Sequence, residues 1–224
     1  MAAPEVIYIS TRHGSVRVVA SPGAALAVDG GQIERSPEGR LQIRRDRDAS
    51  RIDVRCASGS DLTIGTASGS VECTGALGSV RISTTSGKVS VESATKLDVR
   101  TRSGVVAVGA VNGECRVMTT SAKVLVGSAG RATVATVSGH VLCGEVDRAE
   151  VKTVSGKVAL ATKGAGRVAA KTISGRVEVK VPPGRKPTTR LTSVSGRIDS
   201  ECPSGTDGEI FVSTVSGRIK VSSA

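Results

Sequence analysis

Aromatic side chains are nearly absent from this 224-residue chain, which has one Tyr, one Phe and no Trp. Large aromatic side chains supply much of the buried volume in most cores, so this core must be thin and filled by small β-branched residues. Long apolar runs are also missing, and no segment approaches the roughly 18 apolar residues of a membrane-spanning helix. The start, MAAPEVIYIS, has no basic segment followed by an apolar stretch, so we expect no secretory signal. We therefore expect a cytoplasmic protein, with peripheral membrane association as its only contact with a membrane.

Patterns for metal, cofactor and redox sites are missing as well. The five cysteines contain no C-x-x-C pair, and the two histidines, His13 and His140, are far apart in the sequence. We expect Cys73, Cys115 and Cys143 to be buried as small hydrophobic residues, because each occupies a repeat position that elsewhere holds Val or Leu. The other two cysteines are expected to be free thiols in a reducing compartment. The sequence therefore predicts no metal and no cofactor.

Sequence signatures of catalysis are equally scarce. There is no G-x-S-x-G nucleophile motif and no G-x-x-x-x-G-K-[ST] phosphate loop, and carboxylates do not recur in pairs that could serve as acid and base. His140 follows Ser138 by two residues, but its repeat position mostly holds Lys or Arg. We expect a protein that is not an enzyme.

A repeat dominates what is present. Ser-Gly recurs from Ser58 to Gly217, with Ser121-Ala122 in the one gap, and from Ser68 onward the steps are 17 to 21 residues. Apolar residues alternate with period 2 after each Ser-Gly and again before the next one, which is typical of half-buried strands. A two-strand unit of this length cannot bury its own apolar side, but stacked copies can. The sequence therefore predicts an all-β fold, a single-stranded, β-helix-like β-solenoid of about nine short two-strand coils.

The two ends of the chain differ from this repeat. Residues 1–55 contain short strand-like segments outside the repeat, and we interpret them as a strand-rich N-terminal cap, because terminal units of solenoids must cover an open edge. Residues 56–224 are interpreted as one continuous β-solenoid domain. The last segment, RIKVSSA, is strand-like to its end. An uncovered last coil is a pairing edge, so we expect self-association through the C-terminal coil.

Residues 57–91, ASGSDLTIGTASGSVECTGALGSVRISTTSGKVSV, followed by repeated T-V-S-G-K/R-V, resemble a bacterial β-strand-repeat family called toastrack and also described as adhesin-like. The resemblance covers essentially the whole chain. It implies a β-solenoid of unknown function with no known enzyme activity. Some members of that family are linked to membranes and to envelope-stress systems, and others are soluble proteins that stand alone. The family offers no catalytic residue for transfer to this sequence.

Basic residues form two columns in the repeat. Alternation turns both columns outward, where stacked cations would attract polyanions such as nucleic acid, an anionic membrane or a cell-envelope polymer. The alternative, which the sequence favours, is a solvated face whose charges discourage aggregation. The first column comprises Lys88, Lys123, Lys157, Arg176, Arg197 and Arg218, and the second comprises Lys96, Arg131, Arg148 and Arg167.

Two further columns precede each Ser. The residue directly before each repeat Ser forms an apolar column. Strict alternation would expose this column and make it a surface stripe that binds a partner, but we favour a corner conformation that buries it. The Thr and Ser column two residues before each repeat Ser is expected to point inward as a hydrogen-bonded ladder, which argues against an ice-binding surface. The apolar column comprises Val137, Val154, Ile173, Val194 and Val215.

Taken together, these patterns predict a non-catalytic scaffold or interaction protein of unknown partner. Its partner would be a protein or an envelope component, held by repeated side chains through many weak contacts. The alternative is a polyanion-binding module that uses the two basic columns.

Overall fold

The computed structural model describes residues 4–36, 41–45, 50–163 and 166–223. The chain forms two compact units, Met1–Asn112 (unit 1) and Gly113–Ala224 (unit 2). The described residues contain thirteen strands and no helix, so the all-β prediction is confirmed. No described helix is therefore available to cross a membrane as a long apolar segment.

Strands β1 to β7 of unit 1 are short, at three to eight residues, and β8 and β9 are longer. Most of these strands pair in parallel and bury alternate residues. In β7, for example, Leu62 and Ile64 are buried while Asp61 is exposed, and the two buried residues pair in register with Val80 and Ile82 of β8. Alternation of this kind places β-branched side chains in one continuous core without any aromatic residue. The strands are β1 (Val6–Thr11), β2 (Ser15–Ser21), β3 (Ala27–Asp29), β4 (Gly31–Arg35), β5 (Leu41–Arg45), β6 (Arg51–Ala57), β7 (Asp61–Ser68), β8 (Val71–Ser86) and the first part of β9 (Lys88–Thr162).

The first strands of unit 1 lie inside the stack. β1 pairs in parallel with both β5 and β7, and β2 pairs in parallel with both β6 and β8. Antiparallel pairing appears only at β3 with β6 and at β4 with β5 among the described strands. Within the segment that the sequence interpretation treats as a cap, β1, β2, β5 and β6 therefore follow the parallel pairing of the repeats, and β3 and β4 depart from it.

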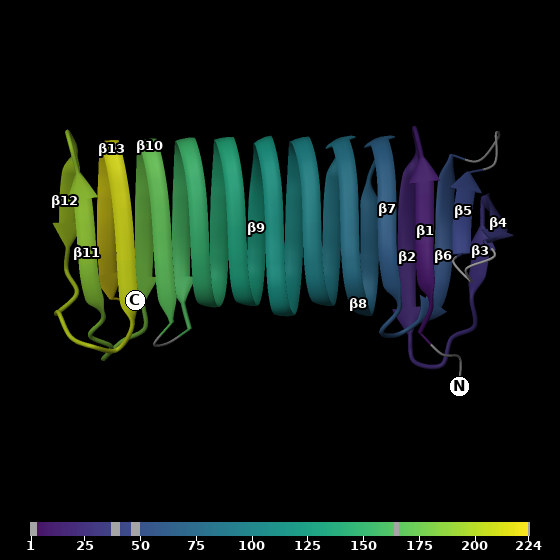
Figure 1. Ribbon diagram of the computed structural model, residues 1–224, viewed down its shortest axis with the longest axis horizontal. Coiled ribbons are helices and arrows are strands. Elements are labelled where there is room, and N and C mark those ends of the chain that lie inside the picture. The colour runs from purple at the N-terminus through teal and green to yellow at the C-terminus, as the bar shows by residue number, and fades with distance from the viewer. Residues whose placement is uncertain (1–3, 37–40, 46–49, 164–165, 224) are drawn as a thin grey trace. The chain divides into compact units, whose positions relative to one another are not determined.

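Unit 2 repeats the same arrangement with successive turns of the chain side by side (Figure 1). Val168 and Ala170 of one strand pair with Ala149 and Val151 of the previous turn, and all four side chains are buried. The strands are the rest of β9, β10 (Arg167–Val181), β11 (Thr188–Ser193), β12 (Arg197–Ser200) and β13 (Glu209–Ser223).

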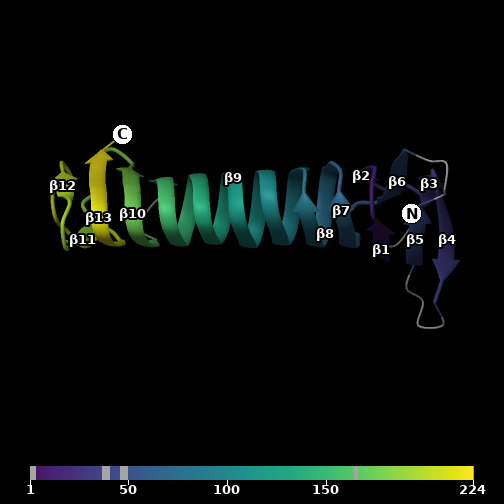
Figure 2. The same cartoon turned by 90° about the horizontal axis from the view of Figure 1, so that it is seen from above.

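The C-terminal strand β13 lies between two other elements and is not an open edge. It pairs in parallel with β10 along one side and with β11 and β12 along the other, an order that Figures 1 and 2 both show. The expectation that the C-terminal coil is an exposed edge is therefore wrong, whereas self-association of the chain stays a prediction. After β10 the chain first forms β11 and β12, which lie one position further out. The last strand, β13, then occupies the position next to β10, so β11 and β12 form the edge.

The buried positions include the cysteines and threonines that the repeat predicted. Cys73, Cys115 and Cys143 are at most 1% exposed, which confirms their prediction as small core residues. Thr153 is buried, and its hydroxyl donates a hydrogen bond of 3.1 Å to the carbonyl oxygen of Ser155. The same bond to a carbonyl two residues ahead recurs at Thr84, Thr101 and Thr136. The inward Thr ladder is therefore confirmed at these corners.

Candidate polyanion-binding surface

Four members of the first basic column lie next to one another in unit 2. Arg176 pairs in register with Lys157 of the preceding turn and with Arg218 of β13, and Arg218 pairs in register with Arg197 of β12. Neighbouring strands are about 4.8 Å apart, so these side chains start from adjacent positions of a single row. We call Lys157, Arg176, Arg218 and Arg197, in this spatial order, the basic row. Arg197 follows Arg218 because β13 is inserted before β12.

Charges along the basic row are only weakly compensated. Lys157 Nζ lies 3.2 Å from a carboxylate oxygen of Glu178. No ion pair is found for Arg176, Arg197 or Arg218 among the residues that the structure describes. Like charges in register repel one another in the folded state, so the row favours an anion from outside the chain.

Other members of the first column are also exposed, as alternation predicted. Lys123 lies in unit 2, at a corner where Ala122 is packed against Gly139 of the next turn. Exposed His140 therefore stands between Lys123 and the basic row. Lys88 is exposed in unit 1.

Three members of the second column surround one depression in unit 2. Arg131, Arg148 and Arg167 line a cavity of about 360 Å³ together with Lys171 and Glu150. Lys152 donates a hydrogen bond of 2.7 Å to Glu150. That bond, helped by the charges of Lys152, Lys171 and Arg167, lowers the pKa of the Glu150 carboxyl. The carboxylate therefore stays ionised near neutral pH and offsets part of the positive charge at the cavity. Lys96, the remaining member of this column, is exposed in unit 1.

Sequence reasoning missed an aromatic contact beside this cavity. The Arg167 guanidinium lies 4.8 Å and that of Arg190 5.8 Å from the centre of the Phe211 ring. Phe211 pairs in register with Ala169 on one side and with Arg190 on the other. The spacing of the repeats could not reveal this cluster, because Arg190 reaches Phe211 only through the insertion of β13 between β10 and β11.

The apolar column of unit 2 is exposed, so the expectation that the corner buries it is wrong. The exposed fractions are 47% for Val137, 43% for Val154, 52% for Ile173, 48% for Val215 and 80% for Val194. Next to Val137, Val154, Ile173 and Val215 the preceding Thr is buried and takes the inward place, since its hydroxyl can satisfy a buried carbonyl group and an aliphatic side chain cannot. Ser193, which precedes Val194, has a buried hydroxyl oxygen without a hydrogen-bond partner among the described residues. We call these five residues the apolar ridge.

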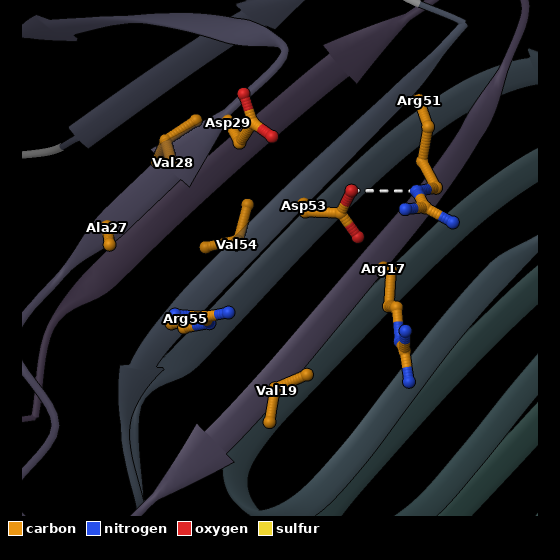
Figure 3. Close-up of a pocket in the computed structure, with 9 residues that line it drawn as sticks. All are labelled: Arg17, Val19, Ala27, Val28, Asp29, Arg51, Asp53, Val54 and Arg55. Atoms are coloured by element: carbon orange, nitrogen blue, oxygen red, sulfur yellow. Dashed lines mark hydrogen bonds and ion pairs between the residues drawn. The ribbon is translucent and has the colours of Figure 1, made fainter.

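A cavity of about 440 Å³ lies in unit 1, between β2, β3 and β6. Arg51 Nε lies 2.7 Å from a carboxylate oxygen of Asp53, and Figure 3 shows this pair on β6 with Asp29 on the neighbouring strand β3. Arg17, also at the cavity, is 3.8 Å from Glu72. Charges of both signs therefore compensate one another at this cavity.

The described residues offer neither a metal site nor a reactive thiol among the core cysteines. In the described ranges there is no cluster of three or more His, Cys, Asp or Glu side chains. Burial raises the pKa of the Cys115 thiol to about 12, and the thiols of Cys73 and Cys143 are raised to the same value chiefly for that reason. At neutral pH these thiols are protonated and poor nucleophiles.

The sequence of this chain matches a known protein family. The sequence profile of the Toastrack DUF4097 family matches residues 31–223. The chain belongs to this family. No curated protein matches the chain.

One solved structure shares the fold of this chain. A crystal structure described as "a putative adhesin" from Bacteroides fragilis NCTC 9343 aligns with a TM-score of 0.53 at 11% sequence identity, over 98% of this chain and 93% of that chain. A "putative cell adhesion protein" from Clostridium sporogenes ATCC 15579 aligns over 99% of this chain and 93% of that chain at 9% identity, with a TM-score of only 0.26. The first likeness shows a shared fold, and the second superposes too poorly to add to it.

Proposed function

We propose that this toastrack protein is a non-catalytic interaction module and that unit 2 binds polyanions through the basic row. The observation that carries the proposal is the register of Lys157, Arg176, Arg218 and Arg197 on adjacent strands. Three of these four cations have no ion-pair partner among the described residues. The cavity at Arg131, Arg148 and Arg167 adds a second group of cations in the same unit.

Comparison with the rest of the surface argues against simple solvation of the row. In unit 1, Arg81 lies 3.8 Å from Asp98 on the neighbouring turn, and Arg17 lies 3.8 Å from Glu72. Such mixed signs keep a sheet surface soluble without repulsion between like charges. A row of cations in register also solvates a surface, but repulsion between the like charges destabilises the folded state. A bound polyanion would remove this repulsion.

The finer architecture that we propose is a single-stranded β-solenoid of about nine two-strand coils. Stacked coils hold equivalent side chains at a fixed spacing, so weak contacts with a repeating anion act together. This mode of binding needs no cofactor and no chemistry on the bound molecule.

Binding of a labelled DNA duplex, used as a soluble polyanion, tests the proposal. We expect the double variant Arg176→Gln, Arg218→Gln to bind at least about tenfold more weakly than the wild type at low salt, because two phosphate contacts are lost. The matched control is Arg116→Gln, Lys163→Gln, which removes the same charge from unit 2 at cations already paired with Glu114 and Glu145. Its affinity should stay within about twofold of the wild type.

The two variants separate a site from a general charge effect. Equal weakening by both would mean that only net charge matters and that the basic row is a solvated face. No binding by the wild-type protein at low salt would also contradict the proposal.

A further inference from the structure

The apolar ridge of unit 2 is a continuous row held in place by hydrogen bonds. The hydroxyl of Thr153, whose shorter bond of 3.1 Å goes to Ser155, also lies 3.4 Å from the carbonyl oxygen of Val137. The hydroxyls of Thr172 and Thr214 donate to the carbonyl oxygens of Val154 and Ile173. Val137, Val154 and Ile173 are thereby tied to the next turn, at 3.4–3.5 Å for these three contacts. The ridge side chains therefore stand on a fixed backbone.

The order of the ridge continues across the inserted strand. Thr172 and Ser174 pair with Thr214 and Ser216, so Ile173 and Val215 lie side by side between these pairs. The backbone amide of Ser195 donates to the carbonyl oxygen of Val215 at 2.8 Å, which places neighbouring Val194 at the outer end. Five exposed β-branched side chains on adjacent turns span about 19 Å at the usual strand spacing.

Cations flank this ridge on both sides. The basic row follows four of the ridge residues by three positions, and exposed His140 takes that place after Val137. On the other side, exposed Lys152 and Lys171 precede Val154 and Ile173 by two residues. Lys171 pairs in register with Lys152. Lys152 is paired with Glu150, whereas Lys171 has no ion-pair partner in the part of the chain that the structure describes. An apolar centre between two cationic margins is the pattern by which proteins lie on anionic lipid surfaces.

We propose that unit 2 docks on an anionic lipid bilayer, with the apolar ridge entering the boundary between headgroups and acyl chains. This inference rests on the proposed function, since the basic row and Lys171 bind the lipid phosphates. Nucleic acid would match the cations but leaves the exposed valines and Ile173 without a role. A peptide partner needs a groove for its side chains, whereas no ridge residue lines either cavity described above. Charge and apolar surface together therefore fit a bilayer best.

A tryptophan reporter tests the geometry directly, because the sequence contains no Trp. The full-length variant Ile173→Trp places the single Trp on the ridge. Leu142→Trp is the matched control, because Leu142 is an equally exposed apolar residue, at 51%, that lies outside the ridge. With vesicles in which phosphatidylglycerol replaces a third of the phosphatidylcholine, we expect a blue shift and protection from a soluble quencher at position 173 alone. Vesicles of phosphatidylcholine alone should produce neither change.

A second variant separates the membrane inference from the proposed function. Val154→Thr, Ile173→Thr, Val215→Thr keeps the β-branched shape and the net charge but removes apolar surface. We expect it to bind the DNA duplex as the wild type does and to bind the anionic vesicles at least about tenfold more weakly.

The outcomes distinguish the two proposals. Vesicle binding unchanged by the triple Thr variant, or a blue shift at position 142 instead of 173, would overturn ridge insertion while leaving the basic row as a polyanion site. Binding to DNA without any binding to vesicles would assign the row to nucleic acid and overturn the lipid inference. Failure to bind either probe would overturn the proposed function itself.

Discussion

Single residues explain why a core without aromatic side chains is possible here. Cys73 pairs in register with Val18 and with Val91 on its two neighbouring strands, and all three side chains are buried. The cysteines thus serve as small core residues, and the sequence predicted this for Cys73, Cys115 and Cys143 because their repeat positions elsewhere hold Val or Leu. The exposure of the apolar ridge was harder to predict. Strict alternation predicts exposed side chains and a corner conformation predicts buried ones, and only the path of the backbone decides between them.

Buried thiols should make the protein sensitive to alkaline pH. Burial raises the pKa of Cys73, Cys115 and Cys143 from 9.0 to about 12, so the folded state keeps protons that the unfolded chain releases. Their stabilising contribution is therefore complete below about pH 9 and is lost between pH 9 and 12, by about 1.4 kcal/mol per thiol and pH unit. Urea unfolding followed by circular dichroism under reducing conditions should show this fall, and replacing all three cysteines by Val should reduce its slope. An identical slope in the Val variant would contradict the assignment.

One corner glycine should be indispensable. Gly156 has φ of 143°, and a Cβ there would overlap the carbonyl oxygen of Gly139 on the preceding turn. We expect Gly156→Ala to lower the free energy of unfolding by about 1–3 kcal/mol. Gly65→Ala is the control, because no atom lies within 4 Å of a Cβ at that position, and it should be neutral or slightly stabilising. Thermal unfolding of both variants measures the difference, and equal melting temperatures would contradict close stacking at this corner.

At the scale of elements, the sequence predicts the strands better than their order. Period-2 alternation and the spacing of Ser-Gly predict parallel turns, and the register of β10 with β9 and with β13 agrees with this. The insertion of β13 before β11 and β12 could not be predicted. Every turn has the same inward ladder of small apolar residues. Alternation therefore permits either β13 or the turn formed by β11 and β12 to stack on β10. The segments that connect these strands decide which of them does.

Hydrogen exchange tests this order. Ile210, Val212, Ile219 and Val221 of β13 are at most 2% exposed, whereas Ile198 of the outer strand β12 is 40% exposed. We expect backbone amides of β13 to exchange as slowly as those of β10 and those of β12 to exchange markedly faster. The reverse ranking, with β12 protected and β13 fast, would mean that the chain stacks in sequence order.

At the scale of the whole molecule, a net charge of +11 favours acidic partners in general, but the specific candidates gather in unit 2. The basic row, the cavity at Arg148 and the apolar ridge all belong to that unit. Composition predicted the charge, and the repeat predicted which cations face outward. Neither could show which cations lack an acidic neighbour, because pairs such as Lys157 with Glu178 join residues far apart in the sequence.

The salt dependence of DNA binding by the full chain tests the central claim most directly. Each phosphate contact releases counterions, so log affinity should fall with log salt concentration with a slope of about −0.9 per contact, or roughly −3 to −4 for the four cations of the basic row. The variant Arg176→Gln, Arg218→Gln should lose about two units of that slope. A slope near zero in the wild type, or one that the variant leaves unchanged, would contradict the basic row as the polyanion-binding site.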